Sequence, residues 1–363
     1  GSEKDDAYLD FMMDRGAEAV ERAFDARQPA EIGALAGYES RVSFNRRFVR
    51  RNGTVISEPD LGGGNGDLLY NEGIIDPTLG VLLVRSPAGR PLGGLVNFAC
   101  HACHHMGRIS AGYPGVLRRK LQATWGRGSV AVFLNGACGN VIHCNFADPA
   151  GKRDMETVGG VLADDVIRMA PSCEYSGRAT LDARSVQVPV KYREIAGLEE
   201  NLRHLERFNV MGALIRKGWY VHSLAVLKAL RARADHEDAE VQVFRIGRVF
   251  LGAVPAEYFA QHALRIKEQS PAAATWVVSL ANGWLGYIPH RAAFERRGGH
   301  ESTWALWSKM APEAGDQLAD AVLEGVRELA RRAPEEERDQ LAGTPSGRVL
   351  TAGPAEEDQG VSV

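Results

Sequence analysis

The chain has 363 residues, of which 45% are hydrophobic and 25% charged, and these proportions are ordinary for a globular protein. Lys and Arg together number 43 against 46 Asp and Glu, so the formal net charge is −3. Nucleic-acid binding depends on clustered basic side chains that neutralise phosphates, and this balance argues against a nucleic-acid partner. No run approaches the roughly 20 apolar residues that a transmembrane helix needs.

The start of the chain does not have the charged region, apolar run and cleavage site of a secretory signal. Gly1-Ser2 resembles the remnant of a removed tag, so this absence says little about the compartment. The five cysteines are odd in number and scattered, unlike the framework of a secreted disulfide-rich protein. The localisation therefore stays undetermined, with the cytoplasm slightly favoured.

Apolar periodicity predicts the secondary structure in chain order. Helices are expected over residues 8–27, 115–124, 156–169, 198–234, 257–268 and 315–332. Strands are expected over residues 80–84, 93–99, 130–134, 179–190 and 275–280, together with a hairpin over 241–254 that turns near Gly247. Residues 60–67 are rich in glycine and are expected to form a loop. The basic residues Arg46, Arg47, Arg50 and Arg51 are interpreted as the solvated face of a strand.

This interleaving predicts a mixed α/β (α+β) fold of layered mixed β-sheets flanked by helices. The hairpin requires antiparallel pairing, so the fold is not simply doubly wound. No Pro- or Gly-rich linker divides the chain, and a single domain is expected over residues 1–333. Residues 334–363 are rich in Glu, Gly, Pro and Ser and have little apolar content, which predicts a disordered acidic tail.

Histidines and cysteines gather directly after the strand predicted at 93–99. Residues 97–105 read Asn-Phe-Ala-Cys-His-Ala-Cys-His-His, and strand ends of layered α/β folds are where active-site loops collect. Imidazole binds zinc, copper, iron and nickel, although the spacing is not that of a zinc finger. We therefore expect His101 to be a metal ligand or a catalytic residue. Adjacent side chains seldom reach one ion, so His104 or His105 is expected to hydrogen-bond around it or to line the pocket.

A second segment, residues 133–144, follows the next predicted strand. Gly136 and Gly139 permit a tight turn, and its exposed amides would be suited to stabilising an oxyanion beside a metal. Asn140 and His143 in this segment are predicted to be catalytic. For three cysteines we favour burial as small apolar side chains over a role as metal ligands: Cys100, Cys138 and Cys144.

Two further segments complete the pattern. Glu257 lies where a predicted strand passes into a predicted helix, and Tyr287 follows the last buried strand. Taken separately, each residue has an ordinary explanation, because Glu257 could be a charge favoured by a helix N-terminus and Tyr287 a packed aromatic. Both explanations stay open at this point.

The four segments, in this order, resemble the N-terminal catalytic domain of the neutral/alkaline non-lysosomal ceramidase family, over about residues 8–332. Residues 97–101 are similar to the family's strand-end Asn-x-(x)-Ala-x-His, and residues 133–142 to its glycine-rich turn. Residues 110–115, Ser-Ala-Gly-Tyr-Pro-Gly, are similar to its Ser-Ala/Ser-Asp-Tyr-Pro-Gly.

The same resemblance extends to the carboxylate and the tyrosine. Pro-Ala-Glu at 255–257 is similar to the family's Pro-Gly-Glu, and residues 282–289 are similar to its Asn-Gly-Tyr-x-Gly-Tyr-Val-Pro. The resemblance implies a zinc site with His101, Glu257 and Tyr287 as ligands, although another transition metal would also suit these donors.

Three departures separate this chain from the family. The family's other zinc histidine lies in a Thr-His-Thr-His-Ser-Gly-Pro-like segment that should precede Tyr8, and nothing here matches it. Either the sequence begins after that segment, or another chain supplies it, or the site is degenerate. Ile142 stands where ceramidases have a catalytic serine, and Gly112 and Asn140 stand where the family has aspartates.

The resemblance leads us to expect a metal-dependent hydrolase of an amide or ester bond in a small-molecule or lipid-like N-acyl substrate. His143 or His104 would move protons, and at least one of His104, His105 and His143 is expected within reach of the metal or substrate. Two alternatives stay open. One is a non-catalytic or incomplete subunit that needs a partner chain or a homo-oligomer, and the other is a histidine-rich metalloenzyme with redox chemistry.

Overall fold

The computed structural model describes residues 5–60, 66–104, 109–148, 150–151, 153–194, 196, 199 and 211–342. His105, most of the loop predicted at 60–67, the first part of the helix predicted at 198–234, and residues 343–363 of the predicted tail therefore lie outside the described residues.

The first large sheet has the strand order β10-β1-β6-β7-β8. Its strands are β10 (Tyr175–Ser176), β1 (Glu31–Tyr38), β6 (Thr78–Arg85), β7 (Pro91–Phe98) and β8 (Val130–Asn135). The pairs are antiparallel except β7–β8, which is parallel and runs from Gly93↔Val130 to Phe98↔Asn135. Because β7 and β8 are parallel, the two segments that follow them leave the sheet at the same edge.

The second large sheet has the strand order β11-β12-β13-β15. Its strands are β11 (Leu181–Lys191), β12 (His236–Ile246), β13 (Val249–Ala253) and β15 (Ala274–Val278). The expected hairpin is β12–β13, which turns at Gly247 with φ +59, a conformation that favours glycine. The pair β13–β15 is parallel. The combination of antiparallel and parallel pairs confirms the predicted mixed fold.

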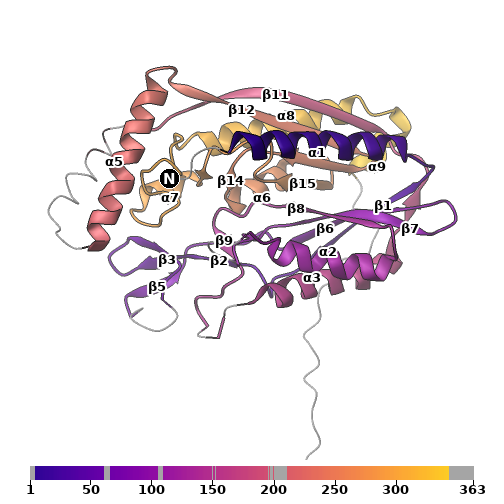
Figure 1. Ribbon diagram of the computed structural model, residues 1–363, viewed down its shortest axis with the longest axis horizontal. Helices are drawn as coiled ribbons and strands as arrows, with labels where there is room; N and C mark the ends of the chain where they lie inside the picture. The colour runs from indigo at the N-terminus through magenta and orange to yellow at the C-terminus, as the bar shows by residue number, and fades with distance from the viewer. Residues whose placement is uncertain are drawn as a thin grey trace, which may run out of the picture.

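The two sheets pack face to face and each is covered by helices on its outer face (Figure 1). Apolar side chains from both sheets, including Leu82, Leu251 and Trp276, form the core between them. The Trp276 ring fits because position 80 is glycine: a Cβ there would lie 2.5 Å from it. The covering helices are α2 (Gly112–Trp125) and α3 (Met155–Met169) on the first sheet, and α6 (Ala260–Gln269) and α8 (Ala314–Arg331) on the second.

A buried amide joins the sheets at the end where the predicted site residues lie. Asn97 is 3% exposed, and its Nδ2 donates to the carbonyl of Leu134 in the first sheet at 3.0 Å and to that of Val277 in the second at 2.9 Å. Since an unpaired buried amide is costly, these bonds hold the ends of β7, β8 and β15 in one arrangement.

Three small sheets surround this end. One pairs β2 (Phe44–Asn45) with β9 (Val141–Ile142) in antiparallel fashion, and another pairs β14 (Glu257–Tyr258) with β16 (Tyr287–Ile288) in parallel. The third has the order β4-β3-β5, with β4 (Val55–Ser57), β3 (Arg47–Arg50) and β5 (Leu68–Asn71).

The remaining described elements lie around this framework: α1 (Asp6–Asp25), the 3-10 turn at Ala170–Ser172, α5 (Met211–Arg231), α7 (Arg291–Glu295) and α9 (Glu335–Ala342). The predicted helix at 8–27 is present as α1, but none of its residues is buried. None of the described helices has both the length and the apolar character that crossing a bilayer requires.

Two predicted boundaries differ from the structure. The helix expected from Glu257 begins only at Ala260, because Glu257 and Tyr258 are engaged in the β14–β16 pair. The tail expected from 334 is helical at first: in α9, Leu341 is 5% exposed, and Glu337 pairs with Arg245 and accepts from Thr180 Oγ1. These contacts with β12 and with the segment before β11 extend the packed domain beyond residue 333.

Candidate functional site

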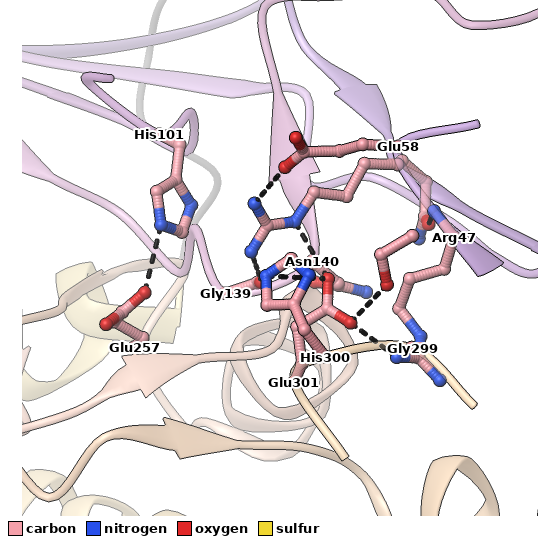
Figure 2. A network of polar contacts seen from close by, with 12 residues as sticks. Arg47, Glu58, His101, Gly139, Asn140, Glu257, Gly299, His300 and Glu301 are labelled. Atoms are coloured by element: carbon pink, nitrogen blue, oxygen red, sulfur yellow. Dashed lines mark hydrogen bonds and ion pairs between the residues drawn. The ribbon is translucent and has the colours of Figure 1, made fainter. Parts of the chain in front are cut away.

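His101 and Glu257 face one another at the edge where β7 and β8 end (Figure 2). The Nε2 of His101 lies 3.0 Å from Oε2 of Glu257. The other ring nitrogen, Nδ1, is 2.5 Å from the backbone carbonyl oxygen of Cys138, which can only accept a hydrogen bond. Nδ1 therefore carries a proton, and the ring is oriented so that Nε2 points at the carboxylate.

Glu257 is placed by the short parallel pair β14–β16, in which Glu257 lies opposite Tyr287. Directly paired residues project to the same face, so the pairing sets the carboxylate beside the phenol. The second carboxylate oxygen, Oε1, accepts a hydrogen bond from Nε1 of Trp284 at 2.9 Å. The side chain of Glu257 is thus held at both oxygens, and only 13% of it is exposed.

Tyr287 completes the cluster. Its ring stacks beside that of His101, with centroids 6.2 Å apart, and the guanidinium of Arg46 lies 5.5 Å from its ring centroid. Burial raises the pKa of the Tyr287 phenol above its ordinary value, an effect that Arg46 partly opposes. The residues that the sequence predicted as metal ligands, His101, Glu257 and Tyr287, are therefore brought together in one cluster.

The electrostatics of this cluster favour a positive charge between the ring and the carboxylate. Burial disfavours the charged form of His101, but the neighbouring Cys138 and the hydrogen bond with Glu257 outweigh it, so the pKa of His101 is raised well above its ordinary value. Burial also opposes the charged form of Glu257, yet the hydrogen bond and charge of His101 lower the pKa of that carboxyl. His101 and Glu257 therefore each stabilise the charged form of the other.

The donor geometry fits a small metal ion. Two donors of one tetrahedral zinc, each about 2.0–2.1 Å from it, lie roughly 3.3 Å apart, close to the 3.0 Å between His101 and Glu257. An Nδ1–H donated to a backbone carbonyl is also the usual way a metal-binding histidine is oriented. In the described part of the chain no three His, Cys, Asp or Glu side chains are placed to hold a metal.

A buried ion-pair network, which the sequence did not predict, lies against Tyr287. The guanidinium of Arg46 is 3% exposed and pairs with Glu58 at 2.6 Å and Glu301 at 2.9 Å, and its Nη2 donates to the carbonyl of Gly139 at 2.8 Å (Figure 2). Arg47 is fully buried and pairs with Glu72 and Glu301. The interpretation as a solvated strand face is therefore wrong for Arg46 and Arg47, whose partners come from distant segments, whereas Arg50 is partly exposed and Arg51 is exposed.

Comparisons with known proteins agree with this arrangement at the level of the fold. A scan against protein-family models finds no match, and neither does a search of the curated proteins. Among solved structures, the neutral ceramidase from Pseudomonas aeruginosa matches with a TM-score of 0.58 and 18% identity, over 87% of this chain and 55% of that one. A structure described as ceramidase complexed with C2 matches with a TM-score of 0.59 and 18% identity, over 86% and 56%.

The fold is that of the ceramidase structures. This confirms the fold expected from the resemblance, while the chain spans little more than half the length of either ceramidase chain. Within the ceramidase-like fold, Ile142 lies in β9 opposite Phe44 and is 6% exposed. The position at which the resemblance implies a serine nucleophile is therefore occupied by packed hydrocarbon.

The histidines His104 and His143 form a group of their own. Their rings stack with centroids 3.7 Å apart, and His104 also meets the ring of Tyr113 edge-on at 5.8 Å. His143 is 4% exposed, and Tyr113, which donates to the carbonyl of Cys100, is fully buried. These ring contacts run towards α2 rather than towards Glu257, so the proton-transfer roles expected of His104 and His143 stay predictions. His105 lies outside the described residues.

Asn140 has a structural task in the ceramidase-like fold. Its side chain is fully buried, its Nδ2 donates to Gln261 Oε1 at 2.9 Å, and its Oδ1 accepts from the backbone N–H of Ala260 at 2.9 Å. Both of its polar groups are thus occupied in holding the first turn of α6. The neighbouring amides of Gly136 and Gly139 donate to the carbonyls of Phe98 and Tyr258, so these two are not available as oxyanion donors.

Proposed function

We propose that this chain is a metal-dependent hydrolase of an amide or ester bond in an N-acyl-type substrate, with His101, Glu257 and Tyr287 as the ligands of a zinc ion. The observation that carries the proposal is the 3.0 Å approach of His101 Nε2 to Glu257 Oε2, with Nδ1 anchored to the Cys138 carbonyl. The ceramidase-like fold supports the hydrolase class. Zinc, when bound, polarises a carbonyl and lowers the pKa of a bound water towards neutrality.

The chain's own residues favour direct attack by water over a covalent intermediate, because Ile142 offers no nucleophile. The base that the geometry favours is His300. Its ring meets Tyr287 edge-on at 5.4 Å, its side chain is 40% exposed, and burial lowers its pKa below the ordinary value. A neutral imidazole near neutral pH can accept a proton from the attacking water. Arg46 acts as a positioning residue, since it lies against the Tyr287 ring and donates to the Gly139 carbonyl.

The test is hydrolysis of a panel of fluorogenic N-acyl amides and esters by zinc-loaded protein. The wild-type chain should turn over at least one member, and His101→Ala and Glu257→Gln should each lower kcat/KM by at least about 100-fold, since both remove a ligand. His236→Ala serves as the matched control, because His236 begins β12 and its ring pairs with Asp235 and Asp238. Turnover that survives His101→Ala unchanged, or no turnover of any member, would contradict the proposal.

Ceramide itself is a separate arm of the same test. Little or no turnover of a fluorogenic ceramide is expected from this chain alone, because no nucleophilic side chain stands at position 142. Efficient ceramide cleavage would show that another group of the chain performs that step.

A further inference from the structure

An apolar pocket of about 760 Å³ adjoins the His101–Glu257–Tyr287 cluster. The two share Tyr287, which lines the pocket and lies opposite Glu257 in the β14–β16 pair. Trp219, Ser223, His300, Leu306 and Trp307 also line the pocket. The volume is in the range of pockets that hold small-molecule ligands, about 300–1,000 Å³.

One wall of the pocket belongs to α5. Trp219 and Ser223 are four residues apart and therefore share a face of the helix. Ser223 is 1% exposed, and its Oγ accepts a hydrogen bond from the backbone N–H of Leu306 at 3.1 Å. This bond ties α5 to the loop that forms the opposite wall. Trp219 itself is 55% exposed, so a large apolar ring stands half in solvent at the pocket.

The opposite wall, which contains Trp307, is held in place relative to the His101–Glu257–Tyr287 cluster by hydrogen bonds. The carbonyl of Trp307 accepts the backbone N–H of Tyr287 at 2.7 Å, and its indole Nε1 donates to the carbonyl of His300 at 2.9 Å. The Trp219 and Trp307 rings meet at 84°, with centroids 6.1 Å apart, and the rings of Tyr287 and His300 meet at 74°. The pocket thus presents ring faces and edges at right angles from two sides.

We propose that this pocket binds a planar aromatic group that flanks the scissile bond of the substrate. The inference rests on the proposed function, because Tyr287 belongs both to the pocket and to the His101–Glu257–Tyr287 cluster. Face-and-edge arrangements of rings add an attraction beyond the area they bury, because the positive ring edge meets the negative face. A linear alkyl chain gains the buried area alone. Trp219 and Trp307 therefore select for an aromatic substituent.

The inference is tested by binding, separately from catalysis, with two methyl ketones that cannot be hydrolysed: 2-acetonaphthone and 2-undecanone. Calorimetric titration should show 2-acetonaphthone binding about fivefold or more tightly, which corresponds to one favourable ring contact. Trp219→Ala should weaken its binding about tenfold, and Trp219→Phe should restore most of it. Since Trp219 is half exposed, removing its ring should leave the fold intact, which circular dichroism verifies.

The matched control is Phe11→Ala, which removes an aromatic side chain that is 57% exposed on helix α1, outside the pocket, and it should leave the binding of both ketones unchanged. Equal affinity for the two ketones, or an affinity that Trp219→Ala does not alter, would overturn the inference. If 2-acetonaphthone binds as expected but no amide or ester is cleaved, the proposed function fails while the pocket assignment holds. In the hydrolysis assay, amides with the aryl group on the acyl side or the amine side identify which part of the substrate the pocket receives.

Discussion

Glu301 is a carboxylate buried completely between two arginines. Its oxygens lie 2.9 Å from Arg46 Nε and 2.7 Å from Arg47 Nη1, and Ser57 Oγ also donates to it. Burial alone would raise the pKa of Glu301, but the charges of Arg46, His300 and Arg47 outweigh it and lower that pKa to about 2 from 4.5. Because Arg46 also lies against the Tyr287 ring, with Cζ 5.5 Å from the ring centroid, Glu301 helps to position that side of the candidate site.

A lowered carboxyl pKa makes stability depend on pH in a defined window. The unfolded chain binds a proton at Glu301 below about pH 4.5 and the folded chain only below about 2, so the contribution is complete above 4.5 and is lost as the pH falls towards 2. Its size is about 3 kcal/mol, at ~1.4 kcal/mol per pKa unit.

The measurement is the free energy of unfolding in urea between pH 2.5 and 7, for the wild type and Glu301→Gln. The variant should be less stable at pH 7 by about 3 kcal/mol, as when a buried pair is broken, and should show a shallower decline below pH 4.5. Glu324→Gln, which removes a half-exposed partner of Arg331, is the control and should change neither quantity. Identical acid slopes in wild type and Glu301→Gln would show that Glu301 is not the titrating group.

The ion pairs of Arg46 and Arg47 with Glu301 could not be predicted from the local sequence. The segment around Arg46 was expected to be solvated because its local sequence alternates basic and aromatic residues. The partner Glu301 is 254 positions away from Arg47, so no local pattern contains the pairing. His101 could be predicted because it follows an apolar strand directly, whereas the roles of Asn140 and His104 depended on contacts made by other elements.

At the scale of elements, β16 sets the position of Tyr287. Gly286, which precedes it, has φ +88, and a Cβ there would lie 2.4 Å from the carbonyl oxygen of Trp307. That carbonyl is the one that accepts the Tyr287 N–H. Glycine is needed at 286 both for its backbone conformation and for the close approach of the Trp307 backbone.

Gly286→Ala should therefore destabilise the protein by more than the strained backbone alone. Gly89 offers the matched control, because its φ is +82 and a Cβ there would meet nothing within 4 Å. We expect Gly89→Ala to cost about 1–2 kcal/mol from the left-handed backbone. Gly286→Ala should cost about 1–3 kcal/mol more from overpacking and should also weaken zinc binding. Equal losses in the two variants, measured by urea denaturation, would contradict the close approach at Gly286.

Helix α1 is an element that its sequence predicts but whose side chains are not buried by any described part of the chain. None of its residues is buried, and Phe11, Met13 and Val20 are 57%, 65% and 70% exposed. A helix of this length is marginal without tertiary contacts, so its amides should exchange with deuterium far faster than those of α8, whose apolar face is buried. Mass spectrometry of exchanged peptides checks this, and protection of α1 equal to that of α8 would mean that something covers its apolar face.

Helix and strand boundaries show where local patterns stop being sufficient. Apolar runs predicted β6, β7, β8 and the β12–β13 hairpin, because buried strands carry their signal within a few residues. Glu257 was expected at a helix start, and only its pairing with Tyr287, 30 positions further along the chain, makes it a strand residue. Short strands such as β14 and β16 have too few residues to produce a periodic pattern.

At the scale of the whole molecule, the layered mixed fold followed from the alternation of elements, but the stacking of the two large sheets did not. It depends on side chains such as Asn97, which bonds to both sheets, and Trp276, which packs on Gly80. This stacking brings the ends of β7 and β15 together, and with them His101 to Glu257 and Tyr287. The candidate site therefore forms only when both sheets are packed together. Any change that separates the sheets should also separate His101 from Glu257 and Tyr287.

The most direct test of the account is the zinc content of the folded protein. After incubation with zinc, gel filtration and elemental analysis, the wild-type chain should hold close to one equivalent, and His101→Ala and Glu257→Gln should each lower its zinc affinity by at least tenfold, the scale of losing one donor. His236→Ala should bind as the wild type does. A wild-type content below about a tenth of an equivalent, or affinity that His101→Ala leaves unchanged, would contradict the assignment of His101, Glu257 and Tyr287 as a metal site.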